Sequence, residues 1–355
     1  MDRVALVIVG VLFIALTFND VFQSVIVPRS VGRRLRASYY NARALWWTWP
    51  RLARFIRGRD PYKRENFLAA FAPFYLILNL VLWSLMLLIG YGAIFYALRS
   101  QMRPELRTFG EALYFAGSSF LTIGFGDFVG STGITRMFSL LAGASGFGLV
   151  SITTAYLFAV FGSFQTREQF VVSVAARAGS PPSGVALLAI AARAGVVRDL
   201  PSLMRSAESW CASLMETHLA YPVLAYFRSS HDSQSWVGTL GTLLDASVLL
   251  MTTVESDVGE AAILYNIGQH AARDLATYFS AHGFEFAPGP GITREQFTQA
   301  CTDLSAAGLR LREDNTAWER FVSMRSTYAG YLNALAGFFQ IPPLQWISEK
   351  ELPKF

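Results

Sequence analysis

Six residues, Thr122-Ile123-Gly124-Phe125-Gly126-Asp127, combine two alternating glycines with a threonine and a terminal carboxylate. Backbone carbonyls that point at a shared axis can replace the water shell of a cation without adding a fixed charge. Extended backbone alternates the direction of its carbonyls, so holding them on one side requires positive φ, which glycine tolerates. Gly124 and Gly126 provide that freedom, and the Thr122 hydroxyl can add an innermost ligand. The segment therefore predicts a backbone site for a dehydrated cation.

Long apolar stretches surround these six residues. The sequence predicts membrane-spanning helices over residues 1–28, 67–98 and 130–165, because each holds an apolar run able to cross about 30 Å of hydrocarbon. Residues 109–121 are too few to span and are predicted to form a re-entrant helix. Its carboxy-terminal end would favour a cation by about 0.3 to 1 kcal/mol. Ile123 and Phe125 are expected to wedge the segment against this helix.

Charge fixes the expected orientation of these helices. The chain is 53% hydrophobic, which is too apolar for an ordinary soluble protein, and residues 29–64 hold eleven basic side chains against one acid, Asp60. The positive-inside rule places this stretch in the cytoplasm, the N-terminus outside and Asp127 at the outer mouth. A cleaved signal peptide is the competing interpretation of residues 4–27, but only Arg3 precedes them and no small-residue cleavage pattern follows.

The motif in this frame resembles the signature of the potassium channel family, over about residues 67–165. The resemblance implies a homotetramer, with K⁺ held only at the carbonyls of residues 122–126 and no organic cofactor. It also implies a glycine hinge in the third span, for which the candidates are Gly143, Gly146 and Gly148. Close helix packing is an equally good explanation of those glycines. Departures from the family pattern at Phe115, Ser118 and Leu121 put the bracing of the filter in doubt.

The segment over residues 29–66 is both basic and aromatic. Arg51, Arg54 and Arg57 recur every third residue, as in voltage sensors, but they lie between Pro50 and Gly58. An amphipathic helix at the cytoplasmic interface explains them better, with its arginines on anionic lipid and its aromatic side chains among the headgroups.

Four further features have both a functional and a structural interpretation. Asn19 and Asp20 fall inside the first span, where they either serve a function or pair with a nearby arginine. Arg136 is a candidate partner of Glu111 or Asp127. The two cysteines and four histidines show no metal-ligand spacing, which favours buried thiols and satisfied histidines.

Residues 166–355 predict a separate helical domain in the cytoplasm. Helices are expected over residues 185–196, 200–228, 234–282, 293–311 and 314–339. The glycine-rich strand-to-helix turn that marks nucleotide-binding domains is missing from the sequence. The domain is therefore expected to bind an unknown cytoplasmic ligand or protein, or only to help the chain form tetramers.

The sequence as a whole predicts an all-α, multi-pass protein of the plasma membrane that conducts K⁺ passively, with gating by the inner helix and the helical domain. We find no motif of an enzyme or of nucleic-acid binding. The alternative is a membrane-anchored sensor or scaffold, weakly selective or without conduction, whose helical domain binds a partner.

Overall fold

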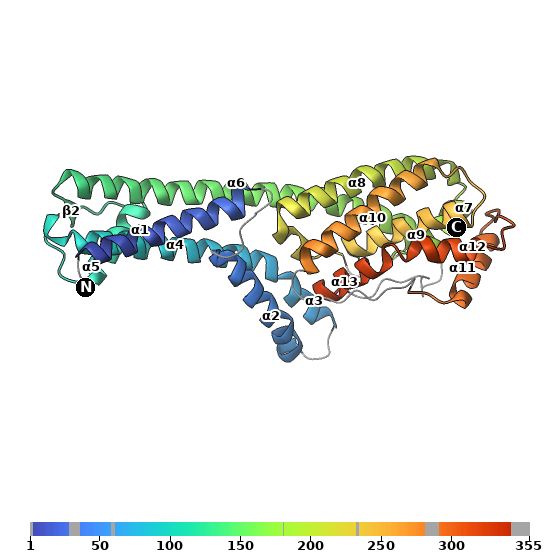
Figure 1. Ribbon diagram of the computed structural model, residues 1–355, viewed down its shortest axis with the longest axis horizontal. Coiled ribbons are helices and arrows are strands. Elements are labelled where there is room, and N and C mark those ends of the chain that lie inside the picture. Colours follow the sequence, from blue (N-terminus) through green and yellow to red (C-terminus); the bar gives the residue numbers. More distant parts are fainter. Residues whose placement is uncertain are drawn as a thin grey trace. The chain divides into compact units, whose positions relative to one another are not determined.

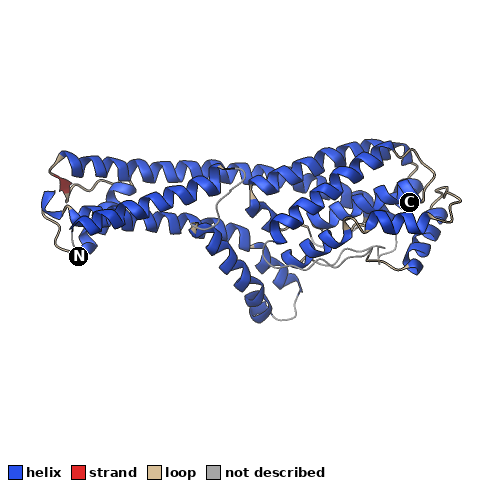
Figure 2. Ribbon diagram, viewed as in Figure 1, coloured by secondary structure: helices blue, strands red, loops and turns tan. Residues whose placement is uncertain are grey.

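The computed structural model describes residues 3–27, 36–57, 61–179, 181–231, 234–280 and 291–341. These residues are almost entirely helical, which confirms the all-α fold (Figures 1 and 2). Three helical segments are long and apolar enough to cross a membrane: Arg3–Ile26, Tyr62–Ala97 and Gly133–Ala178. The chain divides into two compact units, Met1–Phe161 and Gly162–Phe355, each of which is described by itself.

The first unit is built on helices α1 (Arg3–Val21), α4 (Phe71–Ala97) and the first part of α6 (Gly133–Ala178). A π-helical turn, Phe22–Ile26, extends α1. The short helix α5 (Phe109–Phe120) and the strands β1 (Met102–Arg103) and β2 (Val129–Gly130) lie at one end of this unit, called here the filter end, and α2 (Ala37–Arg57) and α3 (Pro61–Ala69) at the other (Figure 1).

Helix α6 continues well past residue 165, where the sequence analysis ended it. The change from apolar to polar composition at Gln165 does not end the helix, because residues 165–178 contain neither glycine nor proline. The helix ends only at Ala178, immediately before Gly179, which has φ +81°.

Two glycines bring α1 and α4 into backbone contact. A Cβ on Gly10 would lie 2.6 Å from the Gly90 carbonyl oxygen, and a Cβ on Gly90 would lie 2.9 Å from the Gly10 carbonyl oxygen. Membrane helices gain much of their association energy from such close approach. This crossing therefore accepts only glycine at both positions.

Asp20, near the end of α1, has a structural role. Its side chain is 1% exposed, and it accepts hydrogen bonds from the Ser38 backbone N–H at 2.9 Å and from Trp83 Nε1 at 2.9 Å. Arg36 Nε lies 3.8 Å from its Oδ1. The carboxylate thus joins α1 to the start of α2 and to α4, and a buried carboxylate with this many donors is stable inside the protein.

Two tryptophans of α2 pack against the neighbouring helices α3 and α4. Trp49 stacks on Phe67 with ring centroids 4.7 Å apart and donates from Nε1 to the Phe67 carbonyl at 3.0 Å. Trp46 meets Phe71 edge to face at 4.6 Å. Both half-buried side chains thus anchor α2 on α3 and α4, while their place among lipid headgroups stays a prediction.

The second unit contains the end of α6 and seven further α-helices among the described residues. They are α7 (Gly184–Arg193), α8 (Leu200–Ala220), α9 (Trp236–Thr252), α10 (Gly259–Ser280), α11 (Arg294–Ala306), α12 (Ala317–Arg325) and α13 (Ala329–Phe339). The predicted helix over residues 200–228 is too long, because Pro222 begins a 3₁₀ turn (Pro222–Tyr226) after α8 has ended.

The single helices predicted over residues 234–282 and 314–339 are wrong, since each is broken into two. The first break is stabilised by an extended segment from elsewhere in the chain: Arg312 N–H donates to the Thr253 carbonyl and Glu255 N–H to the Arg310 carbonyl, both at 2.9 Å. Residues far apart in sequence make these bonds, so helical periodicity alone gives no sign of the break.

A buried ion pair fixes the core of this unit. Arg325 on α12 donates from Nε to Asp245 Oδ1 at 2.8 Å and from Nη2 to Oδ2 at 3.2 Å. The Tyr328 hydroxyl also donates to Asp245, at 2.6 Å. Two-pronged pairing of this kind sets the register of α12 against α9.

A second buried cluster surrounds Arg167 on α6. Its guanidinium donates to the Leu224 carbonyl at 2.9 Å and the Phe227 carbonyl at 2.8 Å, and it pairs with Glu168 at 2.9 Å. His218 Nε2 lies 3.3 Å from Arg167 Nη1. The prediction of a satisfied histidine is confirmed for His218, which is fully buried, whereas His282 lies outside the described residues.

This environment predicts a pH-dependent stability. Burial, and then the charge of Arg167, hold the pKa of His218 well below its ordinary value of 6.5. As the pH falls below about 6.5 the unfolded chain takes up a proton that the folded chain refuses, so the free energy of unfolding decreases. We expect the full-length protein to melt at a lower temperature at pH 5.5 than at pH 7.5, and H218Q to show a smaller decrease.

His270 provides the matched control. It is exposed on α10, so H270Q removes an imidazole without changing the buried cluster and should keep the pH dependence of the native chain. Equal pH dependence in H218Q and the native chain would contradict the assignment to His218.

Candidate functional site

Helix α5 positions residues 122–127, called here the filter. It begins at an N-cap in which Thr108 Oγ1 accepts from the Glu111 N–H at 3.2 Å, while Glu111 Oε2 accepts from the Arg107 N–H at 2.6 Å. These bonds satisfy donors that a helix start leaves unpaired.

Because Arg136 Nε donates to the Gly130 carbonyl at 3.0 Å, the expected pairing of Arg136 with Glu111 or Asp127 is wrong.

The filter backbone takes a positive φ at every second residue. Thr122 has φ +55°, Gly124 φ +66° and Gly126 φ +82°. Nothing lies within 4 Å of a Cβ built on either glycine, so glycine is required there by backbone conformation and not by crowding. Positive φ was predicted for the two glycines but not for Thr122. A threonine adopts positive φ only where contacts with the rest of the protein impose it.

Ser118 holds the filter to α5. Its carbonyl accepts from the Ile123 N–H at 2.9 Å and from the Gly124 N–H at 3.4 Å, and its hydroxyl accepts from the Phe125 N–H at 3.4 Å. Ser118 departs from the family pattern, and that departure put the bracing of the filter in doubt. In the structure this serine is itself the brace, and through it three successive amides are turned toward α5.

The carbonyls of residues 122–126 accept no hydrogen bond from any residue that the structure describes. The amides of residues 122–125 donate to α5, while the five consecutive carbonyl oxygens have no partner among the described residues. Residues 122–126 are exposed in the single chain, so this row of oxygens is open either to water or to a cation that replaces its hydration shell with carbonyls.

Aromatic packing supports the other side of the filter. Phe125 stacks on Tyr114 of α5 with centroids 6.0 Å apart, and Phe128 meets the same ring at 6.3 Å. Phe115 faces away, buried against Phe95 at 4.7 Å. The aromatic side chain of α5 that packs on the filter is therefore Tyr114 and not its neighbour Phe115, because consecutive helical side chains point about 100° apart.

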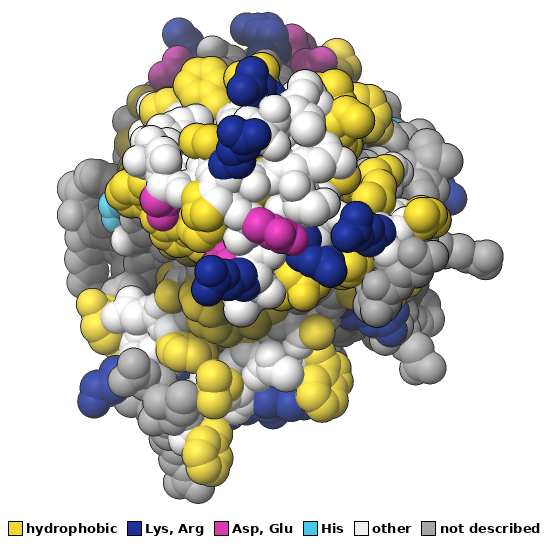
Figure 3. All heavy atoms as spheres, turned by 90° about the vertical axis from the view of Figure 1, so that its left-hand side faces the viewer, with side chains coloured by type: hydrophobic (Ala, Val, Ile, Leu, Met, Phe, Trp, Pro, Cys, Tyr) yellow, Lys and Arg dark blue, Asp and Glu magenta, His cyan; other side chains and the backbone are white. Residues whose placement is uncertain are grey.

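Strand pairing closes the chain around the filter. Met102 pairs with Gly130 and Arg103 with Val129, and Thr132 Oγ1 donates to Gln101 Oε1 at 2.7 Å. The side chains on this end face carry both charges, with basic groups prominent (Figure 3). Asp127 is exposed there, and its Oδ1 accepts from the Phe128 N–H at 3.1 Å.

The three candidate hinge glycines have different surroundings. A Cβ on Gly146 would lie 1.9 Å from the Phe120 carbonyl oxygen, and one on Gly143 would lie 3.2 Å from that of Ser119. Nothing lies within 4 Å of a Cβ on Gly148. Close packing thus explains Gly146, where α6 rests on the end of α5, while a hinge at any of the three stays a prediction.

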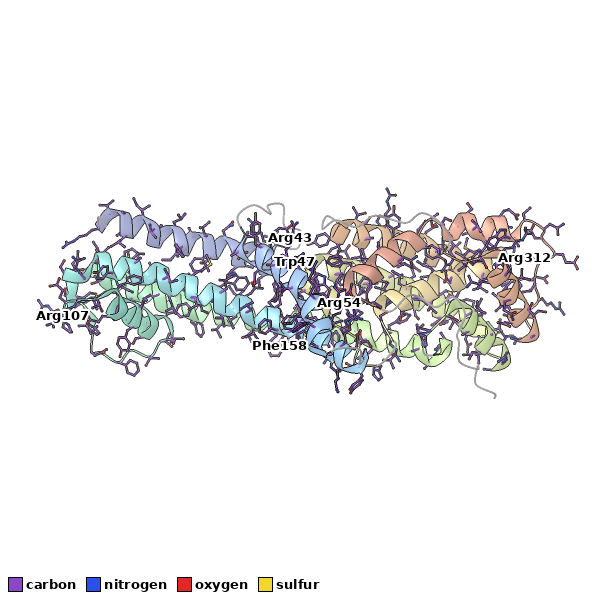
Figure 4. The ribbon with its side chains drawn as sticks, turned by 90° about the horizontal axis from the view of Figure 1, so that it is seen from below. Arg43, Trp47, Arg54, Arg107, Phe158 and Arg312 are labelled. Carbon is purple, nitrogen blue, oxygen red and sulfur yellow. The ribbon has the colours of Figure 1, made fainter. Side chains whose placement is uncertain are left out.

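The basic face of α2 is exposed. Arg51 lies over the Trp47 ring at 4.0 Å from its centroid, and Trp47 is 62% and Phe55 88% exposed. Figure 4 labels Arg43, Trp47 and Arg54 on this helix. The side chain of Arg57 lies outside the described residues.

Comparison with known proteins agrees with this geometry. Residues 83–163, which enclose α5, the filter and the first part of α6, match the sequence profile of a protein family described as "Ion channel". The chain is 23% identical over 178 residues to the "Uncharacterized membrane protein YdjJ" of Bacillus subtilis (strain 168), which covers 49% of this chain and 51% of the relative. The chain thus spans about half the length of that curated relative. No solved structure matches it significantly.

The fold and the family match together support an ion-conducting segment at the filter end. Among the described residues, no group of three or more His, Cys, Asp or Glu side chains could hold a metal ion.

The contact between Gly146 and Phe120 gives a mutational prediction. Gly146→Ala should lower the melting temperature and the yield of folded protein, because the new methyl group meets a backbone oxygen that cannot move freely. Gly148→Ala, two residues along the same helix in open space, should leave both unchanged. Equal effects of the two substitutions would show that α6 does not rest on α5 at Gly146.

Proposed function

We propose that this chain is one subunit of a homotetrameric potassium-selective channel. The observation that carries the proposal is the row of five filter carbonyls that accept no hydrogen bond from any described residue, held by alternating positive φ and by Ser118. Four such rows around one axis provide rings of oxygens that replace the hydration shell of K⁺. The ion-channel family match over residues 83–163 supports the same assignment.

The exposure of apolar filter side chains in a single chain is consistent with assembly into a tetramer. Ile123 is 51% and Phe125 63% exposed, although both lie between spans of a membrane protein. Neighbouring subunits would cover these side chains and close the ring, since one chain brings only one filter.

In the proposed orientation the N-terminus and Asp127 face the outside of the plasma membrane. The α2 and α3 region and the second unit then lie in the cytoplasm, where basic residues are enriched. The second unit is proposed to act on α6, which continues into it, in response to a cytoplasmic ligand or protein.

Ion flux from proteoliposomes tests the function. We expect native protein to release K⁺ down its gradient and to pass Na⁺ far more slowly. Gly124→Ala should abolish this selectivity or the flux itself, because alanine disfavours φ +66°. Gly133→Ala, at a glycine in open space at the start of α6, is the matched control and should conduct normally.

Equal K⁺ and Na⁺ flux in the native protein would contradict the proposed K⁺ selectivity. No flux from correctly assembled tetramers would favour a membrane-anchored sensor or scaffold.

We further propose that the exposed face of α2 binds anionic lipid, through Arg43, Arg51 and Arg54. Each arginine near an anionic surface adds about 1 kcal/mol of attraction. The triple change of these arginines to glutamine should weaken binding of anionic phospholipid to the detergent-solubilised protein, with less effect in high salt. Changing the exposed Arg193, Arg198 and Arg273 to glutamine removes the same charge and should leave binding intact. Equal losses would point to net charge alone.

A further inference from the structure

A small cavity in the second unit is lined by the last turn of α6, by α7 and by the start of α8. Its volume is about 40 Å³, which is room for about three water molecules. Much of its wall is apolar and at most 8% exposed, through Leu187, Ile190, Ala191 and Leu200. Because ordered water needs polar partners that these side chains do not offer, this part of the cavity suits a short aliphatic group.

The turn after α7 shapes one side of the cavity. Gly195 has φ +71°, its N–H donates to the Ala192 carbonyl at 3.1 Å, and the Val196 N–H donates to the Ala191 carbonyl at 2.9 Å. These two bonds are those of a Schellman motif, which reverses the chain at a helix end and brings the residue after the glycine back onto the last turn. Val196 and Ala191 accordingly line the same cavity.

Two side chains of opposite charge complete the lining. Arg177 belongs to the last turn of α6, and Asp199 immediately precedes α8. Both are exposed, and neither makes a hydrogen bond or an ion pair with any described residue. The cavity therefore joins an apolar wall to one cation and one anion that the described chain leaves without a partner.

Asp199 stands where a carboxylate usually serves its own helix. It is the N-cap residue of α8, yet its side chain accepts no capping hydrogen bond. An N-cap carboxylate accepts from the second or third backbone N–H of its helix, and the second residue here is Pro201, which has no N–H. The Asp199 carboxylate is thus available to a donor that enters the cavity.

From this arrangement we propose that the cavity binds a small aliphatic amino acid in its zwitterionic form. The aliphatic side chain occupies the apolar part, Arg177 donates to the ligand carboxylate, and Asp199 accepts from the ligand ammonium group. A hydrocarbon would use neither charge, and a simple amine or carboxylic acid would use only one. Pockets of this kind take their specificity from a few polar groups set in an apolar lining.

The position of Arg177 connects this site with α6. An amino acid held by Arg177 would be the cytoplasmic ligand that acts on α6, a step that rests on the proposed function. Binding itself does not depend on conduction, because all the lining residues belong to the second unit.

Calorimetric titration of the full-length protein in detergent tests the ligand class. We expect L-valine or L-leucine to bind at millimolar concentration. Isocaproate, which is leucine without its ammonium group, and isoamylamine, which is leucine without its carboxylate, should each bind about tenfold more weakly than leucine. Binding of neither valine nor leucine would overturn the proposal, and so would binding of the much larger L-tryptophan as tightly as leucine.

Paired substitutions test the site. Asp199→Asn should weaken leucine binding about tenfold and leave isocaproate binding unchanged, while Arg177→Gln should weaken leucine binding and leave isoamylamine binding unchanged. Glu216→Gln and Arg273→Gln remove the same charges from exposed positions outside the cavity and should bind leucine like the native chain. Native leucine affinity in both Asp199→Asn and Arg177→Gln would overturn the assignment.

Flux from proteoliposomes separates this proposal from conduction. A change of K⁺ flux on addition of leucine to the native chain, lost in Arg177→Gln, supports the action on α6. Leucine binding without K⁺ flux from the native chain supports the site and contradicts conduction. Selective K⁺ flux without binding of valine or leucine supports conduction and contradicts the site.

Discussion

A backbone oxygen in the interior of a membrane needs a partner, and this requirement organises the first unit. The filter carbonyls have none within the described chain, because Ser118 draws the neighbouring amides to α5. Everything around the filter keeps that arrangement in place. The N-cap at Thr108 sets the start of α5, the stacking of Phe125 on Tyr114 supports the filter from behind, and the strand pair beyond Asp127 holds its far end.

Glycines at helix contacts and buried polar groups stabilise the rest of the structure. Glycines place helix backbones in contact at the crossing of α1 with α4 and where α6 rests on α5. Such contacts suit a membrane, where lipid tails provide no hydrophobic force between helices. The second unit contains buried ion pairs at Asp245 and at Arg167. Asp245 also accepts from the Tyr328 hydroxyl, and Arg167 also donates to two backbone carbonyls, which helps to offset the loss of hydration.

Much of this could be predicted from sequence, for identifiable reasons. Apolar length defined the spans, and the conformational demands of Gly124 and Gly126 defined the filter. The positive φ of Thr122 and the role of Ser118 depend on contacts between the filter and α5, which no single-residue preference encodes. The break between α9 and α10 was not predicted for the same reason, since residues 310–312 stabilise it from far along the chain. Arg136 donates to the nearby Gly130 carbonyl, although its charge alone suggested a carboxylate as its partner.

The contact of Gly146 with the Phe120 carbonyl also divides α6 into a part that packs on α5 and a part that follows it. Residues before this point bear directly on the helix that holds the filter, so displacing them would disturb the ion ligands. In the proposed channel, a movement of α6 that leaves the filter in place would have to pivot at Gly146 or farther along, where no described residue lies within 4 Å of a Cβ on Gly148. The proposed gating would then bend the part of α6 that follows this contact, and its energy need not be drawn from the filter.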